Sequence, residues 1–225
     1  MRRFTNRREA GQELAAQLDA FRGRSDVVVL ALPRGGVPVA FEVAEAIGAP
    51  LDVFGVRKLG APMNEEYAIG AIATGGVAAI DWNAVRALHV SDAALAAVVE
   101  RERRELDRRE RLYRGARPIL PVAGRTVIII DDGLATGSTM RAAVAAIRTL
   151  GPARVVVAAP VASLEACRML RRVADACVAY ATPEPFYGVG NWYDDFSQTS
   201  DAEVLEILQR SALHAGAATR TARSA

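Results

Sequence analysis

The sequence has few of the residues that metal centres and disulfides need. Only two cysteines, Cys167 and Cys177, and two histidines, His89 and His214, occur among 225 residues. The cysteines lack the CxxC or Cys/His spacing of a zinc site or a redox pair, which predicts two buried thiols in a reducing compartment. The histidines stand alone, and the sequence offers no Ser/His/Asp or Cys/His arrangement for nucleophilic catalysis.

Long apolar runs and an excess of one charge are also missing. No stretch approaches the roughly 18 unbroken apolar residues of a membrane span, and the opening residues MRRFTN lack the apolar core of a secretion signal. We therefore expect a cytoplasmic protein with no membrane partner. The 28 lysines and arginines face 26 aspartates and glutamates, a net charge of +2. This balance argues against a nucleic-acid partner.

The composition is typical of a folded globular chain. Hydrophobic residues make up 51% and charged residues 24% of a length that fits one domain. We expect a single domain over 1–210, with a helical insertion at 82–118 and an aromatic segment at 182–200. The small and basic residues of 211–225 predict a disordered tail.

Apolar runs alternate with amphipathic stretches, which predicts an α/β fold with a mostly parallel central sheet flanked by helices. The run VVVLAL at 27–32 is typical of a strand buried on both faces. A helix at 38–47, ended by Gly48, and a strand at 51–56 complete a βαβ unit with a right-handed crossover. Further strands are expected at 68–73, 77–80, 126–130, 155–159 and 176–180, and further helices at 6–18, 91–113, 139–150, 163–173 and 201–209.

The predicted helix at 91–113 is highly charged. Between 100 and 111 only Leu106 is apolar. Acids and arginines stand four residues apart, so the helix can neutralise its own charge as a solvated element. It is also a candidate for a cap or a dimer arm. The spaced pairs are Glu100/Arg104, Glu105/Arg109 and Asp107/Arg111.

The stretch VIIIDDGLATGST at 127–139 carries the strongest functional signal. An apolar strand delivers Asp131 and Asp132 to the carboxyl edge of the sheet, where open α/β folds bind ligands. The TGST sequence at 136–139 then brings backbone N–H groups and hydroxyls to the start of a helix, a pattern that favours phosphate binding. A ligand with vicinal hydroxyls and a nearby phosphate, such as ribose 5-phosphate, would satisfy both. The alternative is a plain strand-to-helix turn with surface acids.

This stretch resembles the ribose-phosphate signature of the type I phosphoribosyltransferases at every position. The resemblance implies that Asp131 and Asp132 bind the ribose hydroxyls as catalytic residues. It implies that the turn holds the 5-phosphate through Ala135, Thr136, Gly137, Ser138 and Thr139. Across 4–208 the order of elements is most similar to a little-characterised branch of predicted phosphoribosyltransferases. The Walker A and GxGxxG phosphate loops of other nucleotide-binding families are absent from the sequence.

Two further loops fit the same site. Arg34, Gly35 and Gly36 follow the first strand, where an arginine fork and close backbone approach suit a pyrophosphate group. Taken alone this is also the pattern of a tight turn. Arg57 and Lys58 end the second strand, and the resemblance implies pyrophosphate contacts for both and a catalytic role for Lys58. A solvated strand end is the alternative. The segment 59–67 is then expected to be a mobile loop that covers the site.

The resemblance implies a Mg²⁺-dependent transfer of the phosphoribosyl group from phosphoribosyl pyrophosphate to a nitrogenous acceptor, with release of pyrophosphate. Such a reaction needs positioning and electrostatics rather than a covalent nucleophile. The Mg²⁺ is expected to bind mainly through the substrate, near Asp131 and Asp132, with no direct protein ligand. A homodimer is expected by resemblance alone. The alternatives are a non-catalytic regulator that binds a nucleotide or phosphoribosyl pyrophosphate, and a hydrolase or phosphotransferase acting on sugar phosphates.

The acceptor is expected to be small and planar. Phe186, Tyr187 and Trp192 lie in the glycine-rich aromatic segment, the candidate for the hood that covers such sites, and could stack on a base. They could equally pin the C-terminal segment onto the sheet. Enzymes for 6-oxopurines usually carry a third acid where Ala135 stands, so that branch is disfavoured.

Overall fold

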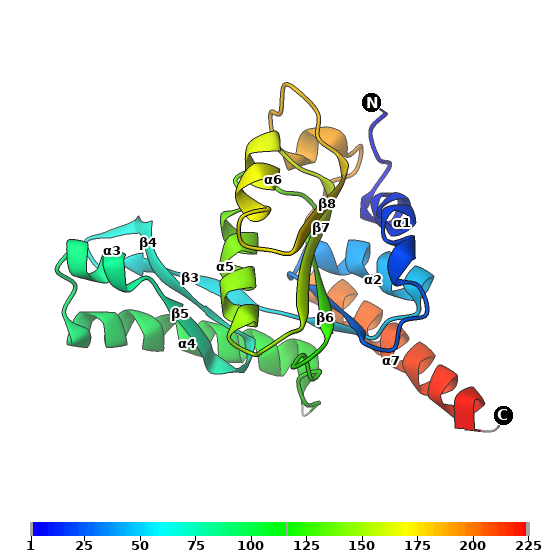
Figure 1. Ribbon diagram of the computed structural model, residues 1–225, viewed down its shortest axis with the longest axis horizontal. Coiled ribbons are helices and arrows are strands. Elements are labelled where there is room, and N and C mark those ends of the chain that lie inside the picture. Colours follow the sequence, from blue (N-terminus) through cyan, green and yellow to red (C-terminus); the bar gives the residue numbers. More distant parts are fainter. Residues whose placement is uncertain (1, 116, 224–225) are drawn as a thin grey trace.

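The computed structural model describes residues 2–115 and 117–223 (Figure 1). Its centre is a five-stranded sheet in which every neighbouring pair is parallel. This confirms the expected α/β fold. The strand order is β2 (Leu51–Val53), β1 (Val27–Ala31), β6 (Thr126–Ile130), β7 (Arg154–Val161) and β8 (Ala176–Ala181).

Helices cover both faces of the central sheet because its inner strands are apolar on both sides. Every residue of β1 and β6 is buried, and successive side chains enter opposite cores. Figure 1 shows one layer of helices on each side of the sheet. One layer consists of α1 (Arg7–Gln17), α2 (Gly36–Ile47) and α7 (Asp201–Arg223), and the other of α5 (Ser138–Arg148) and α6 (Leu164–Leu170).

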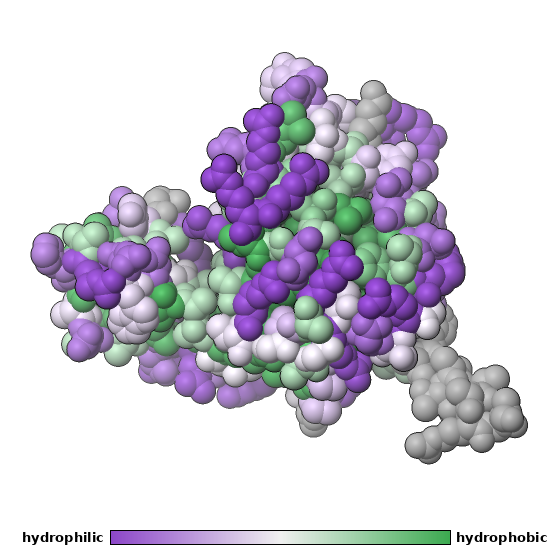
Figure 2. Space-filling view, viewed as in Figure 1, coloured by the Kyte–Doolittle hydropathy of each residue, from purple (hydrophilic) through white to green (hydrophobic). Residues whose placement is uncertain are grey.

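A smaller antiparallel sheet projects from the central body, at the left of Figure 1. It consists of β3 (Val56–Ala61), β4 (Asn64–Ala73) and β5 (Val77–Ile80), and it packs against α3 (Trp82–Ala87) and α4 (Asp92–Arg114). Figure 2 shows apolar residues where this sheet meets the body. The single strand expected at 51–56 is in fact two, since β2 ends at Val53 and β3 begins at Val56 in another sheet. The segment 59–67, expected to be a mobile loop, forms the β3–β4 hairpin instead.

The charged helix α4 is partly a core element. Leu95, Val98 and Leu106 pack against the antiparallel sheet, so α4 has one apolar face toward the sheet and one charged face toward solvent. On the solvated side Arg104 pairs with Glu100 at 2.9 Å and Arg109 with Glu105 at 2.8 Å, two of the three expected pairs. The buried Arg114 guanidinium binds Asp52 at 3.1 Å and anchors the end of α4 to β2.

The C-terminal helix is longer than the sequence pattern predicts. We expected it to end at 209 and to be followed by a disordered tail, but the backbone of α7 is helical from Asp201 to Arg223. Residues 224 and 225 of the predicted tail lie outside the described residues. Within the part of the chain that the structure describes, no helix has both the length and the apolar character needed to cross a bilayer.

Three short 3₁₀ helices complete the described elements: η1 (Asp19–Phe21), η2 (Thr74–Gly76) and η3 (Val189–Trp192).

Candidate functional site

The acidic turn lies at the carboxyl end of β6, as predicted. Oδ1 of Asp131 accepts a hydrogen bond of 2.9 Å from the Asp132 amide, and the Tyr193 hydroxyl donates to the Asp132 carbonyl at 2.6 Å. Burial raises the pKa of Asp131 well above its ordinary value, and the neighbouring charge of Asp132 raises it further. Burial also raises the pKa of Asp132, although Arg7 opposes this shift. The turn therefore holds two carboxyls whose joint ionisation is costly until a ligand or cation compensates it.

The turn after the acids presents unused backbone donors. Gly137, with φ +70°, is the N-cap residue of α5, and the left-handed conformation suits glycine. The Ser138 amide donates to the Thr136 hydroxyl at 3.3 Å. Among the described residues, the amides of Ala135, Thr136, Gly137 and Thr139 make no hydrogen bond within the protein. The start of α5 can therefore bind an anion through amides and the helix dipole.

The Arg34-Gly35-Gly36 loop meets the acidic turn directly. A Cβ on Gly35 would lie 2.0 Å from Oδ2 of Asp132, and one on Gly36 would lie 2.7 Å from the Ile130 carbonyl oxygen. Both glycines are needed because the two turns touch, a use that the sequence did not suggest. The Pro33–Arg34 peptide is cis. The Arg34 guanidinium lies 3.8 Å from a carboxylate oxygen of Asp201, the first residue of α7.

Arg57 and Lys58 point in different directions because successive strand residues face opposite sides. Arg57 donates to Glu102 of α4, with the closer contact at 2.7 Å, and so forms an ion pair within the protein. Lys58 lines a cavity of about 400 Å³ between the antiparallel sheet and α5. Ser138 and Thr139 of the predicted phosphate turn line the same cavity.

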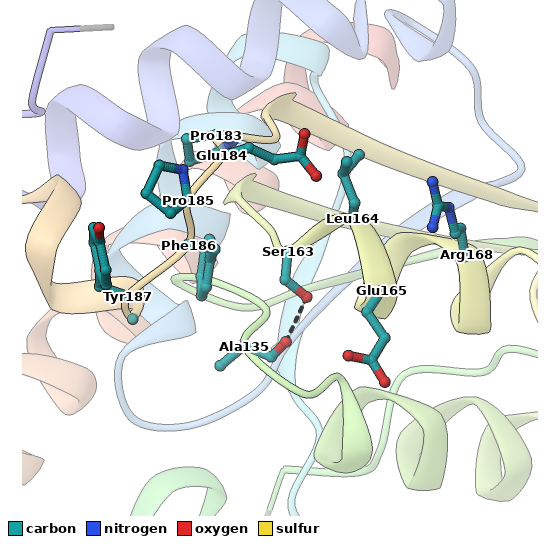
Figure 3. A pocket seen from close by; sticks show the side chains of 11 residues that line it. Ala135, Ser163, Leu164, Glu165, Arg168, Pro183, Glu184, Pro185, Phe186 and Tyr187 are labelled. Atoms are coloured by element: carbon teal, nitrogen blue, oxygen red, sulfur yellow. Dashed lines mark hydrogen bonds between the residues drawn. The ribbon is translucent and has the colours of Figure 1, made fainter.

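Two of the three predicted acceptor-pocket aromatics line one cavity. Phe186 and Tyr187 line a cavity of about 530 Å³ at the carboxyl edge of the central sheet, together with Ala135 and Ser163 (Figure 3). The Ser163 hydroxyl donates to the Ala135 carbonyl at 2.6 Å and so fixes the cavity wall to the phosphate turn. Trp192 does not line this cavity. Like Phe186, it packs against the cluster of Phe4, Val161 and Tyr193, and its indole nitrogen is buried without a hydrogen-bond partner.

Sequence reasoning missed Arg7. The sequence predicts a helix at 6–18 and gives it no part in the site, but Arg7 Nε donates to Oδ2 of Asp132 at 2.8 Å. The contact joins residues 125 positions apart in the sequence, so no local sequence pattern predicts it. The role of Tyr193, whose hydroxyl supports the acidic turn, was missed for the same reason.

Metal-ligating side chains are sparse around this site. The described residues contain no cluster of three or more His, Cys, Asp or Glu side chains suited to a metal ion. Cys167 and Cys177 are free, the first buried and the second half-buried. Their thiols are hydrogen-bonded to each other, and this bond, aided by Arg171, lowers the pKa of Cys167 to about 7 despite the opposing effect of burial. The spacing of the two cysteines in the sequence did not indicate that their thiols would be neighbours.

The paired acids, the anion-binding turn and the glycine loop at one sheet edge agree with the sequence comparison. Residues 4–179 match the model of the phosphoribosyl transferase domain, and the chain belongs to this family. Two curated proteins of Mycobacterium tuberculosis, from strains CDC 1551 and H37Rv, each named "Putative phosphoribosyl transferase", are 45% identical over 210 residues. The match covers 93% of this chain and 47% of theirs, so the chain spans about half the length of these relatives.

A solved structure supports the same relationship. The crystal structure of TT1426 from Thermus thermophilus is 44% identical in sequence and superposes with a TM-score of 0.85. The match covers 93% of this chain and 99% of that one. The arrangement of both sheets therefore belongs to a fold already seen by experiment in a close relative.

Proposed function

We propose that the protein transfers the 5-phosphoribosyl group of phosphoribosyl pyrophosphate to a planar nitrogenous acceptor and releases pyrophosphate. One observation carries the proposal. The carboxylates of Asp131 and Asp132 and the unused amides of residues 135–137 and 139 belong to a single turn at the ligand edge of the sheet. Hydroxyl-accepting and phosphate-binding groups at this spacing suit ribose 5-phosphate.

The acidic and the basic residues have separate roles in the proposed reaction. Asp131 and Asp132 accept hydrogen bonds from the ribose hydroxyls and stabilise positive charge that develops on the ring as the anomeric bond to pyrophosphate breaks. Arg34, with the backbone of Gly35 and Gly36, and Lys58 bind the departing pyrophosphate. Arg57 is left out of this set because it is paired with Glu102.

A magnesium ion fits this donor set. The two acids repel each other and have raised pKa values, so a nearby cation would favour their ionised forms. Because the described residues contain no metal cluster of their own, the ion would be held mainly by substrate oxygens near Asp131 and Asp132. When bound, it would neutralise charge on the pyrophosphate as that group leaves.

The acceptor is proposed to occupy the cavity beside Phe186 and Tyr187. This cavity shares Ala135 with the phosphate turn, which would bring a stacked base close to the anomeric carbon. A volume of about 530 Å³ is enough for a planar heterocycle. Trp192 is not part of the proposed acceptor site because it does not line this cavity.

Two measurements test this function. Titration calorimetry with phosphoribosyl pyrophosphate and Mg²⁺ should give binding heat for the wild type, and the Asp131→Asn/Asp132→Asn variant should weaken binding by at least about tenfold. Pyrophosphate release should then be followed across a panel of planar nitrogenous acceptors. Binding of phosphoribosyl pyrophosphate with no pyrophosphate release for every acceptor in the panel would favour the regulator over the enzyme. Absence of binding by the wild type would refute both.

A further inference from the structure

Arg7 is held rigidly at the edge of the site. It is the first residue of α1, which starts there because the Asn6 side chain caps the helix by accepting from the Glu9 amide at 3.1 Å. The Arg7 side chain is only 11% exposed. One guanidinium nitrogen donates to the Ser197 carbonyl at 2.7 Å, and the group lies over the Phe196 ring, 4.1 Å from its centre. These contacts leave it little freedom to swing toward a ligand.

The remaining guanidinium contact is to Asp132. Nε donates to Oδ2 at 2.8 Å, and the Asp132 side chain is only 15% exposed. A buried carboxylate without a partner is costly, so this hydrogen-bonded ion pair stabilises the charged form. Gly35 also lies against Oδ2 and leaves no room there for a Cβ, and the Tyr193 hydroxyl donates to the backbone carbonyl of Asp132. Asp132 is thereby fixed by three segments distant in the sequence.

Two carboxylate oxygens of the turn stay accessible. Within the described residues, Oδ1 of Asp132 and Oδ2 of Asp131 have no hydrogen-bond partner, and neither is a fully buried unpaired atom. They are therefore the oxygens that a sugar hydroxyl can reach. Arg7 occupies the other oxygen of Asp132 and so determines which one is presented.

We propose that Arg7 is a positioning residue for sugar binding, which fixes the Asp132 carboxylate through Oδ2 so that Oδ1 remains available to a ribose hydroxyl. This inference rests on the proposed function, since it needs a ribose at the acidic turn. Arg7 itself does not touch the substrate. Its effect should therefore appear in the affinity for the sugar and not in that for pyrophosphate, which the neighbouring loop binds.

The test compares two ligands and three variants. Ribose 5-phosphate carries the diol and the phosphate, whereas inorganic pyrophosphate carries neither the sugar nor its hydroxyls. Calorimetric titrations with each ligand in the presence of Mg²⁺ would use the wild type, Arg7→Met and Arg7→Lys. Arg8→Met is the matched control, because Arg8 is the next residue of α1 and its exposed side chain pairs with Glu42 at 3.1 Å.

We expect Arg7→Met to weaken ribose 5-phosphate binding by about tenfold or more, the loss of one charge-assisted hydrogen bond, and to change pyrophosphate binding by less than about threefold. Arg7→Lys should recover part of the sugar affinity because it keeps the charge but loses the fork. Arg8→Met should bind both ligands like the wild type. If Arg7→Met does not fold, Arg7→Lys carries the test, with a smaller loss confined to the sugar.

Other results would overturn the assignment. Unchanged sugar affinity in Arg7→Met would show that Asp132 needs no positioning by this residue. Equal losses for both ligands, or no recovery in Arg7→Lys, would show a general structural role. Failure of the wild type to bind ribose 5-phosphate would instead refute the proposed function, so the two failures are distinguishable.

Discussion

Gly35 lies against the carboxylate of Asp132, so close that a Cβ would stand 2.0 Å from Oδ2. The backbone of Gly35 is ordinary right-handed helical, with φ −57° and ψ −33°. Glycine is therefore required here by contact and not by conformation. The contact joins the loop proposed for pyrophosphate to the turn proposed for the ribose, which ties the two halves of one substrate site together.

Replacing Gly35 by alanine tests this contact, because it places a methyl group where the Asp132 carboxylate lies. We expect Gly35→Ala to lower the free energy of unfolding by about 1–3 kcal/mol, because the new methyl group displaces the Asp132 side chain. The same substitution in an Asp132→Ala background should cost less than about 1 kcal/mol, since alanine otherwise suits a helical backbone. Urea unfolding of the four proteins measures the coupling. Equal costs in both backgrounds would contradict it.

Neutralising Asp131 should stabilise the protein and impair binding. Its raised pKa means that the folded state holds the charged form at a cost at neutral pH. We expect Asp131→Asn to gain about 1–2 kcal/mol, or roughly 2–8 °C in Tm, at pH 7. The gain should shrink as pH falls, because the wild-type carboxyl then takes up a proton. Thermal melts from pH 5 to 8 test this, with the exposed Glu206→Gln as control. A gain that grows toward low pH would contradict the assignment.

Substitutions of the two basic residues of β3 should have different effects, one on ligand binding and the other on stability. Lys58→Met should weaken pyrophosphate binding by about tenfold, because Lys58 lines a cavity shared with the phosphate turn. Arg57→Met should leave pyrophosphate binding unchanged and lower the free energy of unfolding by about 1 kcal/mol, since Glu102 then keeps only its pairing with Arg101. Calorimetry and urea unfolding on both variants provide the comparison. Loss of pyrophosphate affinity in Arg57→Met would restore the role first expected for it.

Substitutions of Phe186 and Trp192 in the aromatic segment should also have different effects. Phe186→Ala should weaken acceptor binding while phosphoribosyl pyrophosphate still binds, because Phe186 lines the cavity beside Ala135. Trp192→Ala should destabilise the fold by about 3 kcal/mol through loss of core packing. Acceptor dependence of turnover and thermal melts report on the two effects. If Trp192→Ala changes acceptor preference without loss of stability, the division is wrong.

Much of the central fold could be predicted because its signals are local. The β-branched runs at 27–31 and 126–130 are apolar on both faces, which only a covered parallel sheet accommodates. The position of Asp131 and Asp132 at the sheet edge followed from the same strand assignment. Three local predictions were wrong: the single strand at 51–56, the loop at 59–67 and the helix end at 209. The segment 59–67 forms a hairpin instead, in which Gly60 lies at an irregularity of the strand pairing.

The remaining site features depend on contacts that no local pattern encodes. Arg7 meets Asp132 only after α1 has packed beside the central sheet. The cavity beside Ala135 is lined by Phe186 but not by Trp192, although both side chains pack against the same apolar cluster. The pairing of Arg57 with Glu102 likewise depends on how α4 crosses β3. Sequence patterns place residues at the ends of strands and helices, but the partner of each charge is decided by tertiary packing.

Helix α5 is a wall shared by two sheets. Its first residues form the proposed phosphate turn, while its length contacts β3, β4 and β5 on one side and β6 and β7 on the other. Ala142 and Ala145 line the gap toward the antiparallel sheet. Bulky replacements at these alanines would wedge the two sheets apart and move the start of the helix with them. These small residues thus set the alignment of the proposed phosphate turn with Lys58, and attempts to engineer new acceptors should keep them small.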